Sequence, residues 1–168
     1  MGGDSVFSFH PHGIGILDSV LITLVHIGSR SAVKDDFERP IQTFQKRTAP
    51  FARFEAIGFK SEEMFFAWIA KQQGRTGASL VLLDNRGRQM TSEAFAAWLG
   101  GRRDEGVQHV VFAVGPPSGW SDQARDRAGM LLSLGQFTLV HPLARLVMAE
   151  QIYRASTILT GHPYHTGH

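Results

Sequence analysis

Short apolar runs alternate with amphipathic segments along this chain. Runs that are apolar at nearly every position, such as residues 20–27 and 109–114, are typical of strands buried on both faces, as in parallel sheets. We therefore predict strands at residues 20–27, 51–59, 78–84, 109–114 and 137–140.

Helices are predicted in the segments between these strands. Three of them begin at a hydroxyl residue that an acidic residue follows closely, the usual arrangement at a helix N-cap: Ser61, Thr91 and Ser121. The helix that starts at Ser61 is expected to end at Gly74, and Pro142 is expected in the first turn of the last helix.

One further amphipathic helix is predicted from the spacing of apolar residues after the first strand. Val33, Phe37, Ile41 and Phe44 recur at helical spacing, so they are expected to share one face. Pro40 lies among them and is expected to kink this helix, because proline lacks the backbone N–H that the helix interior uses.

This alternation of strands and helices predicts an α/β fold, with a mostly parallel sheet and helices on both faces. The chain has 168 residues, the size of one domain, which we assign to residues 20–168. Residues 1–19 contain several glycines and no clear period, so we expect an irregular N-terminal extension. Two explanations are open for it, a mis-set translation start and a lineage-specific arm, and we favour the first.

Composition excludes several classes of protein. The chain has no cysteine, which excludes disulfides, thiolate metal sites and a cysteine nucleophile, and fits a location in the reducing cytoplasm. No apolar run approaches the roughly 18 residues that a membrane span needs, so no membrane association is expected. The net charge of +2 permits an anionic partner without requiring one.

The loops that follow strands of a parallel sheet are the places to look for a ligand. Here these are the loops after Asp84, Val114 and Val140. None of them has the G-x-G-x-x-G pattern of dinucleotide sites or the Walker pattern of nucleotide triphosphate sites, and the chain has no G-x-S-x-G nucleophile elbow. The motifs in these loops therefore leave the ligand open.

The C-terminal region holds most of the remaining candidate chemistry. His162, His165 and His168 recur every third residue, but no HExxH motif accompanies them, so no metal is expected and a metal-binding tail is a weak alternative. Glu150 and the arginine four residues later are spaced for an ion pair. Arg145 lies near a helix start, where the helix dipole disfavours a cation, so we expect it to face an anion or a partner chain.

The same region resembles a known family. The run Thr-Leu-x-His-Pro-Leu-x-Arg-x-x-x-x-Glu-x-x-Tyr-Arg-Ala, here Thr138 to Ala155, and the later His162-Pro-Tyr-His165 resemble the ribosomal RNA large subunit methyltransferase H family. These enzymes belong to the SPOUT superfamily and methylate N3 of a pseudouridine in a hairpin of large-subunit (23S) ribosomal RNA. The resemblance extends from about Val20 to His165 and includes Leu83-Asp84, residues 87–96 and the Gly115 loop.

The resemblance implies a SPOUT-type α/β fold with a C-terminal trefoil knot, S-adenosyl-L-methionine as cofactor, and a homodimer whose active site combines both chains. It also assigns residues to the cofactor site: Leu83, Gly115, Pro116, Leu134, Gly135, Gln136, Phe137, Thr138 and Leu139. Apolar walls and backbone amides are expected to hold the cofactor there.

The chemistry of this reaction suggests roles for the terminal motif. The imide nitrogen that is methylated must lose a proton, and His165 is the candidate base. Arg145 and Arg154 are expected to hold RNA phosphate or the developing negative charge, and Tyr164 to stack on a base. Catalysis is thus assigned to His165, Arg145 and Tyr164, and RNA binding to these three and Arg154. His141 is expected to order the turn before the last helix.

The chain departs from the family pattern in the cofactor loop and at the C-terminus. Pro116 replaces a glycine, which removes a backbone N–H from the cofactor loop, and Thr166 replaces a basic residue after His165. A second hypothesis follows from the Pro116 change: a SPOUT-like RNA-binding or ribosome assembly factor without turnover.

Overall fold

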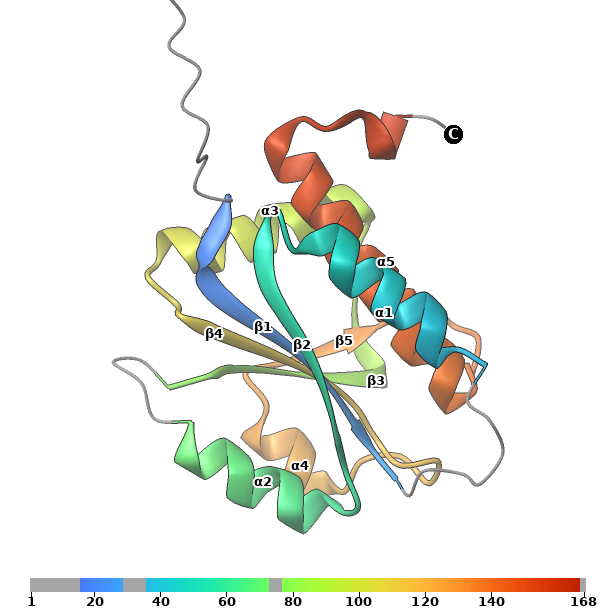
Figure 1. Cartoon of the computed structure of the whole chain (residues 1–168). Helices are drawn as coiled ribbons and strands as arrows, with labels where there is room; N and C mark the ends of the chain where they lie inside the picture. Colours follow the sequence, from blue (N-terminus) through green and yellow to red (C-terminus); the bar gives the residue numbers. More distant parts are fainter. Residues whose placement is uncertain (1–15, 29–35, 73–76, 167–168) are drawn as a thin grey trace, which may run out of the picture.

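The computed structural model describes residues 16–28, 36–72 and 77–166. Within them the chain forms a sheet of parallel strands, with helices on both faces (Figure 1). The strands are β1 (Leu17–Ile27), β2 (Ala52–Phe59), β3 (Ser79–Gln89), β4 (His109–Val114) and β5 (Met130–Ser133). The helices are α1 (Glu38–Thr48), α2 (Glu62–Lys71), α3 (Ser92–Asp104), α4 (Asp122–Arg127) and α5 (His141–Thr160), and a short 3₁₀ turn, η1 (Pro163–Thr166), follows α5.

The strand order is β2-β1-β4-β3-β5, and all neighbouring strands are parallel. Side chains alternate between the two faces along each strand, because successive Cβ atoms point in opposite directions. In β4, for example, Val110 and Phe112 pack on one face and Val111 and Ala113 on the other. Both faces are apolar because both are covered by helices, which explains the solidly apolar runs in the sequence.

The two layers of helices are unequal. One face of the sheet packs against α1, α3 and α5, through residues such as Ile41, Leu99 and Ile152. The other face packs against α2 and the segment leading into α4, with Phe65 and Trp120 as the main contacts. Figure 1 shows the two layers on opposite sides of the sheet. The predicted α/β architecture is confirmed; the trefoil knot that the resemblance implies stays a prediction.

The three predicted N-caps are confirmed, because the side chains of Ser61, Thr91 and Ser121 each accept a hydrogen bond from the backbone N–H three residues later. The predicted kink at Pro40 is wrong. Helix α1 begins at Glu38, so Pro40 lies in the first turn, where a backbone N–H has no partner within the helix in any case. Val33 and Gly74 lie outside the described residues.

Three of the predicted strands differ from the structure. The strand predicted at residues 78–84 is β3, Ser79–Gln89, so the loop expected after Asp84 is part of the strand. Residues 137–140 form no strand, and the fifth strand is instead β5, Met130–Ser133, which pairs with β3. Strand β1 begins at Leu17, within the segment expected to be irregular, because the Leu17 N–H donates to Phe51 O and its side chain is fully buried. Residues 1–15 of the predicted extension lie outside the described residues.

Candidate functional site

A cavity of about 430 Å³ lies at the carboxyl ends of β4 and β5, beside the middle of β3. The lining comes from the middle of β3, the ends of β4 and β5, the loops that follow β4 and β5, and the starts of α4 and α5: Leu83, Asp84, Asn85, Arg86, Val114, Gly115, Pro116, Pro117, Ser118, Gly119, Trp120, Arg125, Leu132, Ser133, Leu134, Gly135, Phe137, Thr138, Leu139, His141 and Ala144. A volume in this range suits a cofactor-sized molecule, and the edge of the sheet is where parallel-sheet proteins bind ligands.

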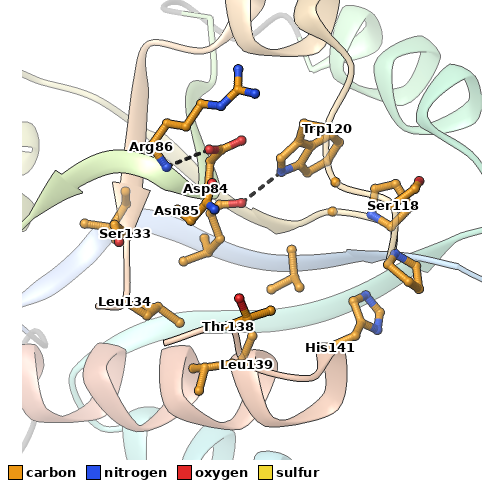
Figure 2. Close-up of a pocket in the computed structure, with 18 of the residues that line it drawn as sticks. Asp84, Asn85, Arg86, Ser118, Trp120, Ser133, Leu134, Thr138, Leu139 and His141 are labelled. Carbon is orange, nitrogen blue, oxygen red and sulfur yellow. Dashed lines mark hydrogen bonds between the residues drawn. The ribbon is translucent and has the colours of Figure 1, made fainter. Parts of the chain in front are cut away.

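The cavity has two chemically different sides. Figure 2 shows Asp84, Asn85 and Arg86 on one side of it and Leu134 and Leu139 on the opposite side. One side thus offers charged and amide groups, and the other offers aliphatic surface. Such a cavity fits an amphipathic ligand with an apolar end and a charged end.

The loop after β4 is held in place by Trp120. The indole Nε1 donates a hydrogen bond to the backbone oxygen of Leu83, at 3.0 Å, and so joins this loop to the middle of β3. The indole ring lies directly over Gly115: a Cβ atom on that glycine would come within 2.8 Å of the ring. Only glycine fits at position 115 while Trp120 stays in place.

The loop after β5 is shaped by Ser133 and Gly135. The Ser133 hydroxyl hydrogen-bonds the backbone oxygen of Gly135 at 2.9 Å. Gly135 has a φ of +130°, a conformation that residues with a side chain rarely adopt. The loop then exposes large apolar side chains beside the cavity, with Phe137 90% and Val140 65% exposed.

A buried ion pair forms part of the charged side. The Asp84 carboxylate accepts from Arg125 Nε at 2.8 Å and from the Arg86 backbone N–H at 2.8 Å, and its side chain is 4% exposed. Burial opposes ionisation of Asp84, but these hydrogen bonds and the charge of Arg125 outweigh it, so the pKa of Asp84 lies below its ordinary value. Hydrogen bonding to Asp84 likewise raises the pKa of Arg125.

A second contact braces the helix that carries Arg125. Both oxygens of the Glu62 carboxylate, at the start of α2, accept from Ser121, one from its backbone N–H at 2.9 Å and one from its hydroxyl at 2.7 Å. Ser121 is also the N-cap of α4. The orientation of α4, and with it of Arg125, is therefore tied to α2.

Arg86 is held much less firmly than Arg125. Its guanidinium lies 4.0 Å from the Asp122 carboxylate, and the two side chains are 66% and 90% exposed. Exposed ion pairs of this kind contribute about 1 kcal/mol or less, because water screens them. Arg86 is thus an exposed cation at the border of the cavity, held only by a weak ion pair.

The residues that the resemblance assigns to the cofactor site lie together. All of them line the cavity except Gln136, which is exposed on the loop after β5. Sequence reasoning did not identify Asp84, Trp120 and Arg125 as part of this site. The position of Asp84 directly after an apolar strand was the signal that could have found it.

The residues assigned to catalysis and RNA binding do not lie at the cavity. Tyr164 and His165 are in η1, beyond the far end of α5, whereas His141 at the start of α5 lines the cavity. Helix α5 has 20 residues and is therefore about 30 Å long. Figure 1 shows the short turn that follows α5, in red, at the end of this helix remote from β5.

Around Tyr164 the side chains form a compact cluster. The Tyr164 hydroxyl donates to Glu150 at 3.0 Å, and the Arg154 guanidinium lies 5.0 Å from the centre of the Tyr164 ring. Arg154 also pairs with Glu150, the ion pair predicted from their spacing. Burial, together with the hydrogen bond to Glu150, raises the pKa of Tyr164, so its hydroxyl stays protonated at neutral pH.

His165 is oriented by its own turn. Its Nδ1 lies 2.8 Å from the backbone oxygen of His162. A carbonyl oxygen only accepts hydrogen bonds, so the neutral ring carries its proton on Nδ1 and leaves the lone pair on Nε2. This is the tautomer that a base acting through Nε2 needs.

Arg145 faces an anion, as expected, but the anion belongs to this chain. Its Nη2 donates to the Glu38 carboxylate of α1 at 3.0 Å, and the residue is 5% exposed. A contact between Arg145 and RNA stays a prediction. In the single chain the guanidinium is covered and ties α5 to α1.

Among the residues that the structure describes, no cluster of three or more histidine and acidic side chains could hold a metal ion. His168, the last of the three spaced histidines, lies outside them. Within the same part of the chain, the helices are too short or too polar to span a bilayer.

A family model described as "Predicted SPOUT methyltransferase" matches residues 20–165. The chain belongs to the SPOUT methyltransferase family, because the match covers most of its length. It is therefore a methyltransferase.

Individual relatives carry a more specific name. Ribosomal RNA large subunit methyltransferase H of Koribacter versatilis is 46% identical over 135 residues, which are 78% of this chain and 92% of that one. The protein of the same name in Brucella ovis is 52% identical over 89 residues, 53% of each chain. The resemblance drawn from the Thr138–Ala155 motif is thus confirmed. A solved structure, the SpoU methyltransferase AviRb of Streptomyces viridochromogenes in complex with AdoMet, superposes with a TM-score of 0.49 at 14% identity, over 84% of this chain and 59% of that one.

Proposed function

We propose that this protein transfers a methyl group from S-adenosyl-L-methionine to N3 of a pseudouridine in 23S ribosomal RNA, acting in the cytoplasm on the large subunit or the assembled ribosome. The observation that carries the proposal is the cavity at the carboxyl ends of β4 and β5, beside the middle of β3, which collects nearly all the residues that the family resemblance assigns to the cofactor. The names of the relatives support ribosomal RNA as the substrate.

The cavity residues fit this cofactor. The aliphatic side, with Leu134 and Leu139, suits an adenine ring, and the polar side suits the zwitterionic amino-acid end. Gly115 and Gly135 lack side chains that would narrow the cavity, so backbone amides can approach a ligand closely. Pro116 also lines the cavity and has no N–H to offer, so the other loop residues must supply the donors.

When bound, S-adenosyl-L-methionine supplies a methyl group that is already activated by its sulfonium. The protein must then align the acceptor nitrogen, exclude water and receive the imide proton. His165 Nε2 is the group we assign to that proton, because the bond from Nδ1 to His162 O leaves its lone pair available. The ring of Tyr164, whose hydroxyl stays protonated, would stack on a nucleobase of the RNA next to His165.

These groups can meet only if two chains contribute. Helix α5 keeps His165 about 30 Å along the helix from the cavity of the same chain. A homodimer that brings the C-terminal turn of one chain to the cavity of the other would form a complete site. The exposed Phe137 and Val140 beside the cavity support a protein surface there, since large apolar side chains are usually covered in the working assembly.

Methyl transfer to ribosomes that lack this modification tests the proposal directly. With tritiated S-adenosyl-L-methionine and purified protein, we expect label in 3-methylpseudouridine, identified by nucleoside mass spectrometry. Label in an adenine or a ribose would contradict the assignment of the product. Binding of RNA without any label would favour the alternative, a non-catalytic RNA-binding or assembly factor.

The role of His165 can be tested in the same assay. The variant His165→Ala is expected to lower the single-turnover rate about 100-fold or more, the usual effect of losing a general base. Its affinity for S-adenosyl-L-homocysteine should equal that of the wild type, because His165 does not line its own cavity. An unchanged rate would remove His165 from the role of base.

A further inference from the structure

We propose that Arg86 binds the carboxylate of the amino-acid end of S-adenosyl-L-methionine, and thereby selects cofactors that carry an intact amino acid. The inference rests on the proposed function, since it assigns the polar side of the same cavity. It names a specificity-determining residue in β3, a strand from which the resemblance assigns only Leu83 to the cofactor site.

The cavity has two cationic side chains in its lining, Arg86 and Arg125. Arg125 already forms two ion pairs within the protein. Its Nε pairs with the buried carboxylate of Asp84, and its Nη1 lies 2.9 Å from Asp122. If Arg125 turned to a ligand, the Asp84 charge would be left buried without its counter-ion, which is strongly unfavourable.

Arg86 can change partners at little cost. Its contact with Asp122 is 4.0 Å long and open to solvent, and Asp122 keeps Arg125 as a closer partner when Arg86 moves away. The backbone of Arg86 is nevertheless fixed, because its N–H is bonded to Asp84. The side chain therefore starts from a defined point on the cavity wall, and its guanidinium is only weakly held.

The chemistry of the ligand decides which of its groups Arg86 can bind. Adenine and ribose carry no charge, and the sulfonium and the ammonium are cations, so the carboxylate is the one anion of the cofactor. A guanidinium binds a carboxylate through two parallel N–H···O bonds, which an ammonium group cannot do. Arg86 lies on the side opposite Leu134 and Leu139 (Figure 2), so adenine against the aliphatic side would direct the carboxylate toward it.

Calorimetry with two ligands tests this assignment. S-adenosyl-L-homocysteine has the carboxylate, and 5′-methylthioadenosine lacks the whole amino-acid end but keeps the nucleoside and the sulfur. Arg86→Gln should weaken binding of S-adenosyl-L-homocysteine about tenfold or more and leave binding of 5′-methylthioadenosine unchanged. Arg86→Lys, which keeps the charge but not the paired donors, should recover only part of the loss.

Arg88→Gln is the matched control. Arg88 lies two residues further along β3, is exposed and does not line the cavity, so its loss removes the same charge from the same strand. It should bind both ligands as the wild type does. An equal loss of both ligands in Arg86→Gln, or no loss of either, would overturn the assignment to the carboxylate. If the wild type bound neither ligand, the proposed function itself would fail, and this inference with it.

Discussion

Asp84 is the most constrained charged residue of the cavity. Its carboxylate is almost completely removed from solvent, and both of its oxygens are used, one by Arg125 and one by the Arg86 backbone. Because the charged form is the one that these partners stabilise, protonation of Asp84 breaks the favourable arrangement. The ion pair therefore links the geometry of the cavity to the protonation of a single group.

The variant Asp84→Asn tests this linkage. Asparagine keeps the shape but not the charge, so at pH 7 we expect the free energy of unfolding to fall by about 1–3 kcal/mol. The folded pKa of Asp84 lies below its ordinary value of 3.8, so the wild-type advantage is complete above that value and is lost as the pH falls through the folded pKa. Urea unfolding between pH 7 and pH 2 measures it; a difference that stayed constant over this range would contradict the linkage.

At this scale the sequence predicts some site residues and not others. The residues proposed to bind the cofactor come from three short segments that the family resemblance identifies without a structure. The pairs that organise the cavity are not continuous: Arg125 bonds Asp84 across 41 residues, and Trp120 bonds Leu83 across 37. No spacing rule relates such positions, because only the packed sheet brings them together.

At the scale of elements, β3 and β5 depend on one glycine. A Cβ atom at Gly87 would lie 2.6 Å from the backbone of Leu131 and Leu132, so the two strands can approach closely only without a side chain there. Strand β5 leads directly into the loop that contains Leu134 and Gly135. The spacing of these strands therefore positions one wall of the cavity.

Gly87→Ala is expected to destabilise the protein by about 1–3 kcal/mol, as overpacking usually does, and to weaken binding of S-adenosyl-L-homocysteine. The control is Gly101→Ala in α3, where nothing lies within 4 Å of the added Cβ. That change should be neutral or stabilise the protein by up to about 1 kcal/mol, because alanine favours helix. Thermal unfolding and calorimetry measure both variants; equal behaviour of the two would contradict the close approach of β3 and β5.

The elements were predicted best where local chemistry decides them. The hydroxyl caps of α2, α3 and α4 act on N–H groups three residues away, so the sequence alone reveals them. Strand β5 was missed because a four-residue strand is defined by its partner β3 more than by its own composition. Residues 137–140 have strand-forming side chains but no neighbouring strand, and three of the four are exposed.

At the scale of the whole molecule, α5 separates the residues proposed to bind the cofactor from those proposed to act on the RNA. The cavity lies at its first residues and the Tyr164–His165 turn beyond its last ones. If each active site takes its cavity from one chain and its terminal turn from another, defects in the two sets should compensate each other in a mixed dimer.

Mixing two inactive variants tests this arrangement. His165→Ala removes the proposed base, and Gly115→Val places a side chain where the Trp120 indole lies. After co-refolding in equal amounts, half of the dimers are mixed and each has one intact site, so methyl transfer should recover to about a quarter of the wild-type rate. The control pairs His165→Ala with Tyr164→Ala, which damage the same turn, and should recover nothing. Absence of recovery in the first mixture would mean that the site is not shared.

The contact between Gly115 and Trp120 also restricts the order in which substitutions can accumulate at these two positions during evolution. Any larger residue at position 115 would clash with the Trp120 indole. Such a substitution is therefore tolerated only after Trp120 has been replaced by a smaller residue. A smaller residue at position 120 in turn lacks the indole N–H that bonds Leu83, so the loop after β4 loses its link to β3. The order of mutational steps is therefore fixed, with Trp120 changing first and an intermediate of reduced stability separating the two loop sequences.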